Sequence, residues 1–386
     1  MAQGKIFAEA THLAVLRRMR LIREKDRPEL IRRVAIAILL GWVPLALLSL
    51  LHASIFHDAA QLTFFTDVAT HARLLLAVPL LIAAEYIIFP RLEAIRQHFT
   101  DASMVGAADR ERFQATVRDC HRRSAGVWPS GTIVIITYAL VLLMMMTIPA
   151  DIMPAWQRSP FGLLLSLAGW WHMLISLPLL LGLLLAWLWR LAIWAYFLGK
   201  VARLGLRLVA SHPDKAGGLQ FIAYSPRVFW PFALAIGIIV AGTMANNVFH
   251  NGVSPLEHKA TPIVTAVIVA ILLAFPPLLF GRQLLNAWRT GVLKYGDLAS
   301  RVGQQLEDKW MGAGSRVSRE TLAEPDFSAT TDLYQVTGNV YAMRLMLFDY
   351  QSVAAVAIVT LLPFAPIWLT AIPLQTLVKN VVGLLF

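Results

Sequence analysis

Seven long apolar runs divide this chain of 386 residues, and they restrict its fold more than any other feature. A helix needs about 20 apolar residues to cross the hydrocarbon core of a bilayer. Only a helix or a closed barrel satisfies its own backbone in lipid, and apolar runs without alternation exclude strands. We therefore predict an all-α, polytopic transmembrane protein with seven spans. The predicted spans are 34–56, 74–89, 128–150, 163–189, 228–248, 263–280 and 353–373.

The basic residues lie almost entirely between these runs. Of 34 Lys and Arg residues, 30 fall in the stretches 1–33, 90–127, 188–227 and 282–351. Cytoplasmic loops retain Lys and Arg, so we predict that the N-terminus lies inside and the C-terminus outside. This arrangement, together with anionic lipid headgroups, accounts for the net charge of +11, and we expect a lipid bilayer rather than nucleic acid as the partner.

We expect one membrane domain with cytoplasmic additions. Residues 1–33 form a cytoplasmic amphipathic N-terminal segment, and the absence of an early apolar run argues against a signal peptide. Residues 34–386 form the seven-span membrane domain. A cytoplasmic helical base comprises 190–227 and 282–351, and the final span covers 353–373.

The base is predicted from helices that continue past the membrane. A helix over 163–210 would be about 70 Å long at 1.5 Å per residue, more than twice the bilayer core. Residues 285–310 repeat apolar side chains at helical spacing, which indicates an amphipathic helix. Its apolar stripe needs a partner, either the other extension or another subunit. A shorter helix over 332–347 is expected to lead into the last span.

Two ionisable residues lie within predicted spans, where charge is costly and often functional. Glu85 is either a carboxylate near the end of a helix that pairs with an arginine of the neighbouring loop, or an ion or proton site. His172 is either a neutral imidazole hydrogen-bonded to a neighbouring helix, or a functional group. Two isolated groups do not make a proton relay.

The loop sequence HPDKAGGL contains His212, Asp214, Gly217 and Gly218. Such a turn is either structural or able to bind a ligand such as phosphate through its amides, but it has no P-loop or Rossmann pattern. The chain has no recognisable catalytic arrangement and no tight metal-ligand spacing, so we expect no enzyme, no cofactor and no metal. The single cysteine, Cys120, is expected to be a structural free thiol.

The last span carries prolines at 363, 366 and 373, which release backbone carbonyls. At membrane depth this is tolerated only against protein or a water-filled cavity. The span is therefore either a kinked, centrally buried helix or a pore-lining one. The candidate pore-lining residues are Thr360, Leu361, Pro363, Ile367, Thr370, Gln375 and Thr376.

Three segments resemble an uncharacterised family of bacterial integral membrane proteins. They are HPDKAGGL at 212–219, residues 327–333 and the tail LLPFAPIWLTAIPL at 361–374. The resemblance covers mainly the second half of the chain, and it implies a location in the bacterial inner membrane. It supplies no activity.

The predicted architecture is also similar to that of the seven-span insect odorant and gustatory receptor channels. That similarity implies a tetramer whose cytoplasmic base joins the subunits and whose last span lines a central cation pore. Residues 332–347 and 353–376 would take those two roles.

Three functions follow as hypotheses. The first is an oligomeric, tetrameric channel for ions, weakly selective for cations, with the last span around the axis. The second is a secondary transporter or lipid-handling protein with its substrate near Glu85 and His172. The third is a membrane sensor or scaffold whose base recruits a partner.

Overall fold

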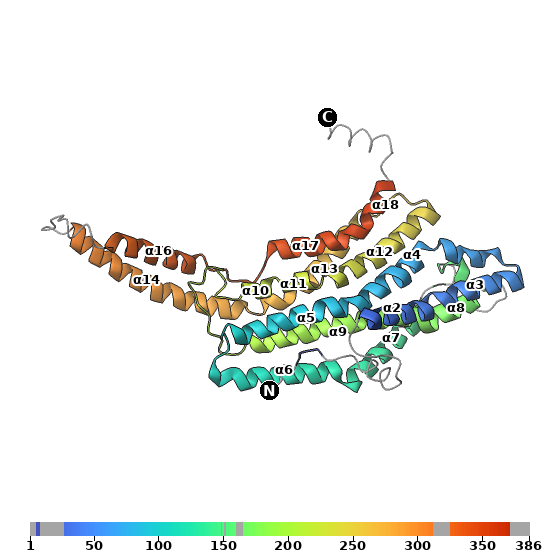
Figure 1. Cartoon of the computed structure of the whole chain (residues 1–386). Coiled ribbons are helices and arrows are strands. Elements are labelled where there is room, and N and C mark those ends of the chain that lie inside the picture. Colours follow the sequence, from blue (N-terminus) through green and yellow to red (C-terminus); the bar gives the residue numbers. More distant parts are fainter. Residues whose placement is uncertain are drawn as a thin grey trace, which may run out of the picture.

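The protein is a bundle of long helices in the computed structural model, which describes residues 5–7, 27–147, 149, 152–159, 165–311 and 325–370 (Figure 1). Among these residues, β structure is limited to one isolated antiparallel bridge between Val105 and Leu206. Seven of the described helices are long and apolar enough to cross a membrane, which confirms the all-α, polytopic prediction. They are Glu29–Phe56, Val68–Asp101, Val127–Thr147, Leu167–Val201, Trp230–His250, Ala260–Leu278 and Tyr350–Thr370.

The second and fourth spans share a local feature. In each, a π-helical turn stands just before a proline, Pro79 or Pro178. Proline has no N–H and its ring crowds the preceding turn, so the helix widens there instead of ending. The second span joins α4 (Val68–His71), η2 (Ala72–Ala77) and α5 (Val78–Asp101), and the fourth joins α8 (Leu167–Trp171), η5 (His172–Ser176) and α9 (Leu177–Val201).

The other described helices follow the apolar and amphipathic runs. The first span consists of α2 (Arg27–Gly41) and α3 (Val43–Phe56), which is followed by the 3₁₀ helix η1 (Ala59–Thr66). The rest are η3 (Ala107–Asp109), α6 (Arg110–Ala125), α7 (Val127–Thr147), η4 (Ala155–Gln157), α10 (Gln220–Ala223), α11 (Ser225–Val228), α12 (Trp230–Asn251), α13 (Ala260–Leu278), α14 (Gly281–Met311), α16 (Asp326–Tyr341), α17 (Tyr350–Leu361), η6 (Leu362–Phe364) and α18 (Ala365–Thr370).

The second and fourth spans are much longer than a bilayer core. They contain 34 and 35 residues, or about 50 Å each at 1.5 Å per residue. The predicted second span, 74–89, was therefore too short, because the helix continues through Pro90 to Asp101. The extended part is amphipathic rather than apolar, so a search for apolar runs alone misses it.

The predicted helix over 163–210 was wrong at its C-terminal end, because α9 stops at Val201. Backbone groups beyond that point bond to residues distant in sequence. Arg207 N–H donates to the Met104 carbonyl at 2.9 Å, and Gly205 N–H donates to Asp109 Oδ2 at 2.9 Å. These tertiary bonds replace the helical ones, and the chain turns back along residues 104–109.

Beyond α13, the helices α14 and α16 form an antiparallel pair that projects from one end of the bundle (Figure 1). The amphipathic helix predicted over 285–310 is confirmed, and within the chain its partner is α16. The helix predicted over 332–347 was wrong in its bounds. It begins directly after Pro325 and ends at Tyr341, since Arg344 N–H donates to the Lys215 carbonyl at 2.7 Å.

The last span lies along one side of the bundle and packs against α12 and α13. Its buried face carries Ser352, Val356 and Thr360. Gly237 on α12 makes this contact possible, because a Cβ there would stand 2.3 Å from the Thr360 carbonyl oxygen. Pro363 lies in the short 3₁₀ segment η6 that divides the span.

The helix α14 projects from one end of the molecule, α6 and α10 lie on that side of the bundle, and α3 and α8 lie toward the other end (Figure 1). The first group belongs to the basic stretches of the sequence and the second flanks poorly charged loops. This separation agrees with a single basic side, and the orientation itself stays a prediction.

Candidate functional site

Glu85 on α5 lies between two arginines from different spans. Arg33 on α2 donates to Glu85 Oε2 at 2.7 Å, and Arg190 on α9 donates to Oε1. All three side chains are about nine-tenths buried. The interpretation of Glu85 as a carboxylate paired with an arginine is therefore supported, although its partners come from spans one and four rather than from a loop.

Aromatic rings complete the surroundings of this cluster. The Arg190 guanidinium lies 4.8 Å from the Trp187 ring centroid and 5.4 Å from that of Phe89. Cation–π contacts of this kind stabilise a partly desolvated guanidinium. Three spans are thus held together by one charged group, whose buried charge is compensated by ion pairing and aromatic faces.

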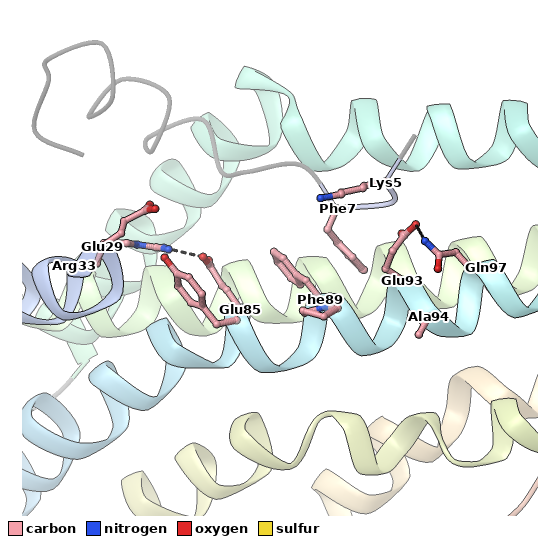
Figure 2. A pocket seen from close by; sticks show the side chains of 11 residues that line it. Lys5, Phe7, Glu29, Arg33, Glu85, Phe89, Glu93, Ala94 and Gln97 are labelled. Atoms are coloured by element: carbon pink, nitrogen blue, oxygen red, sulfur yellow. Dashed lines mark hydrogen bonds and ion pairs between the residues drawn. The ribbon is translucent and has the colours of Figure 1, made fainter. Parts of the chain in front are cut away.

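A cavity of about 380 Å³ opens beside Glu85 (Figure 2). Its walls come from the start of α2, from α5 and from the short N-terminal segment 5–7. Phe7 stacks on Phe89 with ring centroids 4.9 Å apart, and the Lys5 carbonyl lies 2.8 Å from His121 Nδ1 on α6. The lining residues are Lys5, Phe7, Glu29, Arg33, Glu85, Tyr86, Phe89, Pro90, Glu93, Ala94 and Gln97.

Sequence reasoning missed most of this cavity. It singled out Glu85 but placed the amphipathic segment 1–33 only on the membrane surface. The available signal was Glu29, a carboxylate among cations directly before the first apolar run. The stacking of Phe7 on Phe89 joins positions far apart in the chain, and no local pattern indicates it.

His172 lies far from Glu85. It precedes Arg190 by 18 residues on the same continuous span, which corresponds to about 27 Å along a helix. Its ring packs edge-on against Trp156 at 5.4 Å, and Trp156 Nε1 donates to Asp67 Oδ2 at 2.8 Å. The two predicted intramembrane groups therefore belong to separate environments.

The loop that contains His212 and Asp214 is a closed turn. Asp214 Oδ1 accepts from the amides of Ala216 and Gly218 at 2.8 and 3.1 Å, and His212 Nδ1 lies 2.8 Å from the same oxygen. Burial raises the pKa of Asp214, but the amide donors and His212 outweigh it, so that pKa lies below its usual value. The amides that would bind a phosphate are already occupied, which favours the structural interpretation.

The two glycines of this loop serve its close packing. Gly217 has a φ of 66° and Gly218 a φ of 93°, values that disfavour side chains. A Cβ on Gly217 would also approach Leu208 Cβ to 3.3 Å and Met343 Cε to 3.2 Å. The turn thus holds the chain after α9 against the segment that follows α16.

The predicted pore-lining residues of the last span differ in their exposure. Thr360 and Ile367 are buried, and Pro363 lies next to Gly237 on α12. Leu361 is half-buried and Thr370 is exposed, whereas Gln375 and Thr376 lie outside the described residues. Three large aliphatic residues of the span that are exposed were not predicted. They are Ile358, Leu362 and Leu369.

Among the described residues, no three His, Cys, Asp or Glu side chains gather into a group that could hold a metal ion. Comparison with known proteins finds no matching family model, no matching curated protein and no matching solved structure. The class of protein is therefore defined by the fold alone: a multi-pass helical membrane protein with seven candidate spans.

Proposed function

We propose that the protein is an oligomeric ion channel, a tetramer of weak cation selectivity whose last span surrounds a central pore. One observation carries the proposal. The helices α16, α17 and α18 lie along the same long side of the molecule (Figure 1), and each carries exposed apolar or aromatic side chains.

The exposed residues on the α14–α16 pair support self-association. Leu293, Tyr334 and Tyr341 are each about half exposed or more, although this pair lies beyond the end of the sixth span. Lipid does not cover a helix pair outside the spans, so another protein surface is the natural cover. Homo-oligomers usually close around a rotation axis, and one closed ring would bury the pair while placing the last span near that axis.

The last span has the character of a hydrophobic gate in this proposal. Leu362 is 60% exposed and Ile358 is 64% exposed, and each stands two residues from the buried Thr360, which places it on the other side of a helix. A ring of such residues gates by excluding water, and the uncharged Thr370, Gln375 and Thr376 would follow near the outer mouth. Thr360 and Ile367 could line the pore only if they separated from α12.

The first test is the oligomeric state and conductance of the purified full-length protein. Mass photometry in nanodiscs should give the mass of four chains, and planar bilayers should show single-channel currents. A monomer, or the absence of currents from a verified tetramer, would contradict the proposal.

The second test places a cysteine on the proposed pore surface. In Leu362→Cys, a charged thiol reagent should change the current, whereas Ile263→Cys on the exposed face of α13 should be insensitive. The native Cys120 should react little with the reagent, because burial, followed by the charge of Asp119, raises its pKa to about 12. An insensitive Leu362→Cys channel would remove the last span from the pore.

The cavity beside Glu85 favours a second candidate, a secondary transporter or lipid-handling protein, since substrate sites form between spans. Substrate-dependent uptake into vesicles, without single-channel currents, would support it over the channel.

A further inference from the structure

Among the three carboxylates that line the cavity beside Glu85, Glu29 has a buried oxygen without a hydrogen-bond partner. The Glu85 charge is met by Arg33 and Arg190, and Glu93 Oε1 lies 2.6 Å from an Arg96 nitrogen. Glu29, in the first turn of α2, is only 7% exposed, and its Oε2 atom has no hydrogen-bond partner. Of the carboxylates that line the cavity, Glu29 is therefore the one that can accept a further hydrogen bond.

A buried carboxylate oxygen of this kind requires a hydrogen-bond donor, because leaving it unsatisfied is costly. A donor that also carries positive charge forms the strongest such bond. An anion is disfavoured, since the cavity carries three carboxylates and Arg33 is already engaged with Glu85. The Glu29 end of the cavity thus selects a cation with an N–H group.

The remaining walls select the rest of the ligand. Phe7, Tyr86 and Phe89 line the cavity together with Pro90 and Ala94. Aromatic and aliphatic walls of this kind favour an apolar body, and the volume of about 380 Å³ is in the range of small-molecule sites. The exposed Lys5, in segment 5–7, contributes a positive charge to the cavity lining.

We propose that this cavity binds a primary or secondary ammonium group attached to an apolar body, with the ammonium donating to the Glu29 carboxylate. A quaternary ammonium does not satisfy the site, since it has no N–H to donate. The same chemistry is supplied by a free alkyl- or arylalkylamine and by an aminophospholipid headgroup. The inference does not rest on the channel proposal, because no residue of the last span takes part.

The test is calorimetric titration of the full-length protein, in phosphatidylcholine nanodiscs, with 2-phenylethylammonium. The wild-type protein should bind it, and Glu29→Gln should bind roughly tenfold or more weakly, as expected for loss of a charge-assisted hydrogen bond. The N,N,N-trimethyl analogue should show a similar deficit on the wild-type protein. Glu111→Gln, on the exposed surface of α6, is the matched control and should bind normally.

Folding of the variants is checked separately. Glu29→Gln removes a buried charge without breaking an ion pair, so its melting temperature without amine should not fall. Ala94→Trp is an independent variant that leaves Glu29 intact, fills the cavity from an exposed position on α5 and should also abolish binding. Absence of wild-type binding, or equal affinity in Glu29→Gln, Ala94→Trp or the trimethyl analogue, would overturn the proposal.

A second arm distinguishes the two sources of the amine. Nanodiscs that contain phosphatidylethanolamine replace those of phosphatidylcholine alone. Weaker apparent binding of phenylethylammonium to the wild-type protein, unchanged in Glu29→Gln, would assign the site to the lipid headgroup. Unchanged wild-type binding would assign it to a free amine.

Discussion

At the scale of single residues, Asp119 shows how one carboxylate fixes the helix α6 to the bundle. It accepts from Arg122 and Arg123 on α6 at 2.9 and 3.0 Å, and from the Tyr196 hydroxyl on α9 at 2.9 Å. The hydrogen bond from Arg122 is the main reason that its pKa falls to about 2, with Arg123 and Tyr196 adding to it against the effect of burial.

This shift predicts a pH dependence. Because the folded pKa of about 2 lies below the ordinary value of 3.8, Asp119 stabilises the fold above pH 4 and loses that effect between about pH 4 and 2. Asp119→Asn should lower the melting temperature at pH 7, and its difference from the wild-type protein should shrink below pH 4. A difference that is independent of pH would contradict the ion-pair explanation.

Substitution of Glu85 should lower the stability of the fold more than substitution of Asp119. Its removal would leave Arg33 and Arg190 buried side by side without their shared partner. Breaking a buried ion pair in this way costs about 3–5 kcal/mol. Glu85→Gln should therefore lower the unfolding temperature in detergent strongly, whereas the exposed Glu111→Gln should not. A stable Glu85→Gln protein would show that the arginines find other partners.

At the scale of secondary-structure elements, the contact between α12 and the last span depends on one missing side chain. A Cβ at Gly237 would stand 2.3 Å from a backbone oxygen, which cannot move away as a flexible side chain can. Gly237→Ala should cost about 1–3 kcal/mol, the range for overpacking a well-packed contact. Gly131→Ala on α7 is the control, since nothing lies within 4 Å of the added methyl group.

Thermal unfolding and hydrogen exchange of α17 measure this effect. Faster exchange in α17 for Gly237→Ala, but not for Gly131→Ala, is the expected result. Equal exchange in both variants would mean that the last span does not depend on this approach.

The elements also show the limits of sequence patterns. The apolar runs placed all seven spans, and the spacing of apolar residues over 285–310 identified α14. The ends of α9 and α16 were wrong because tertiary hydrogen bonds set them, from Met104, Asp109 and Lys215. A period in the sequence predicts that a helix exists, but distant backbone groups decide where it stops.

At the scale of the whole molecule, the distribution of Lys and Arg predicts orientation. We expect alkaline phosphatase fused after residue 158 to be active, because that loop carries a single Arg and should lie outside. Fusion after residue 210, which follows several cations, should be inactive. Activity after residue 210 would reverse the predicted topology, and with it the placement of the α14–α16 pair.

What the sequence determines by itself is the class of protein. Long apolar runs have no stable alternative to spanning helices, because backbone groups in lipid must bond within their own segment. Charge placed between those runs predicts a single basic side. Both properties are local, so they can be recognised without knowing which helices meet.

The tertiary structure alone decided which side chains meet. Glu85 pairs with Arg33, 52 residues before it, and with Arg190, 105 residues after it. Phe7 stacks on Phe89 and forms part of the cavity wall. The tertiary structure also separated Glu85 from His172 and buried Thr360 against α12. Such contacts depend on the packing of whole helices, whose relative rotation and offset are not encoded in any short segment.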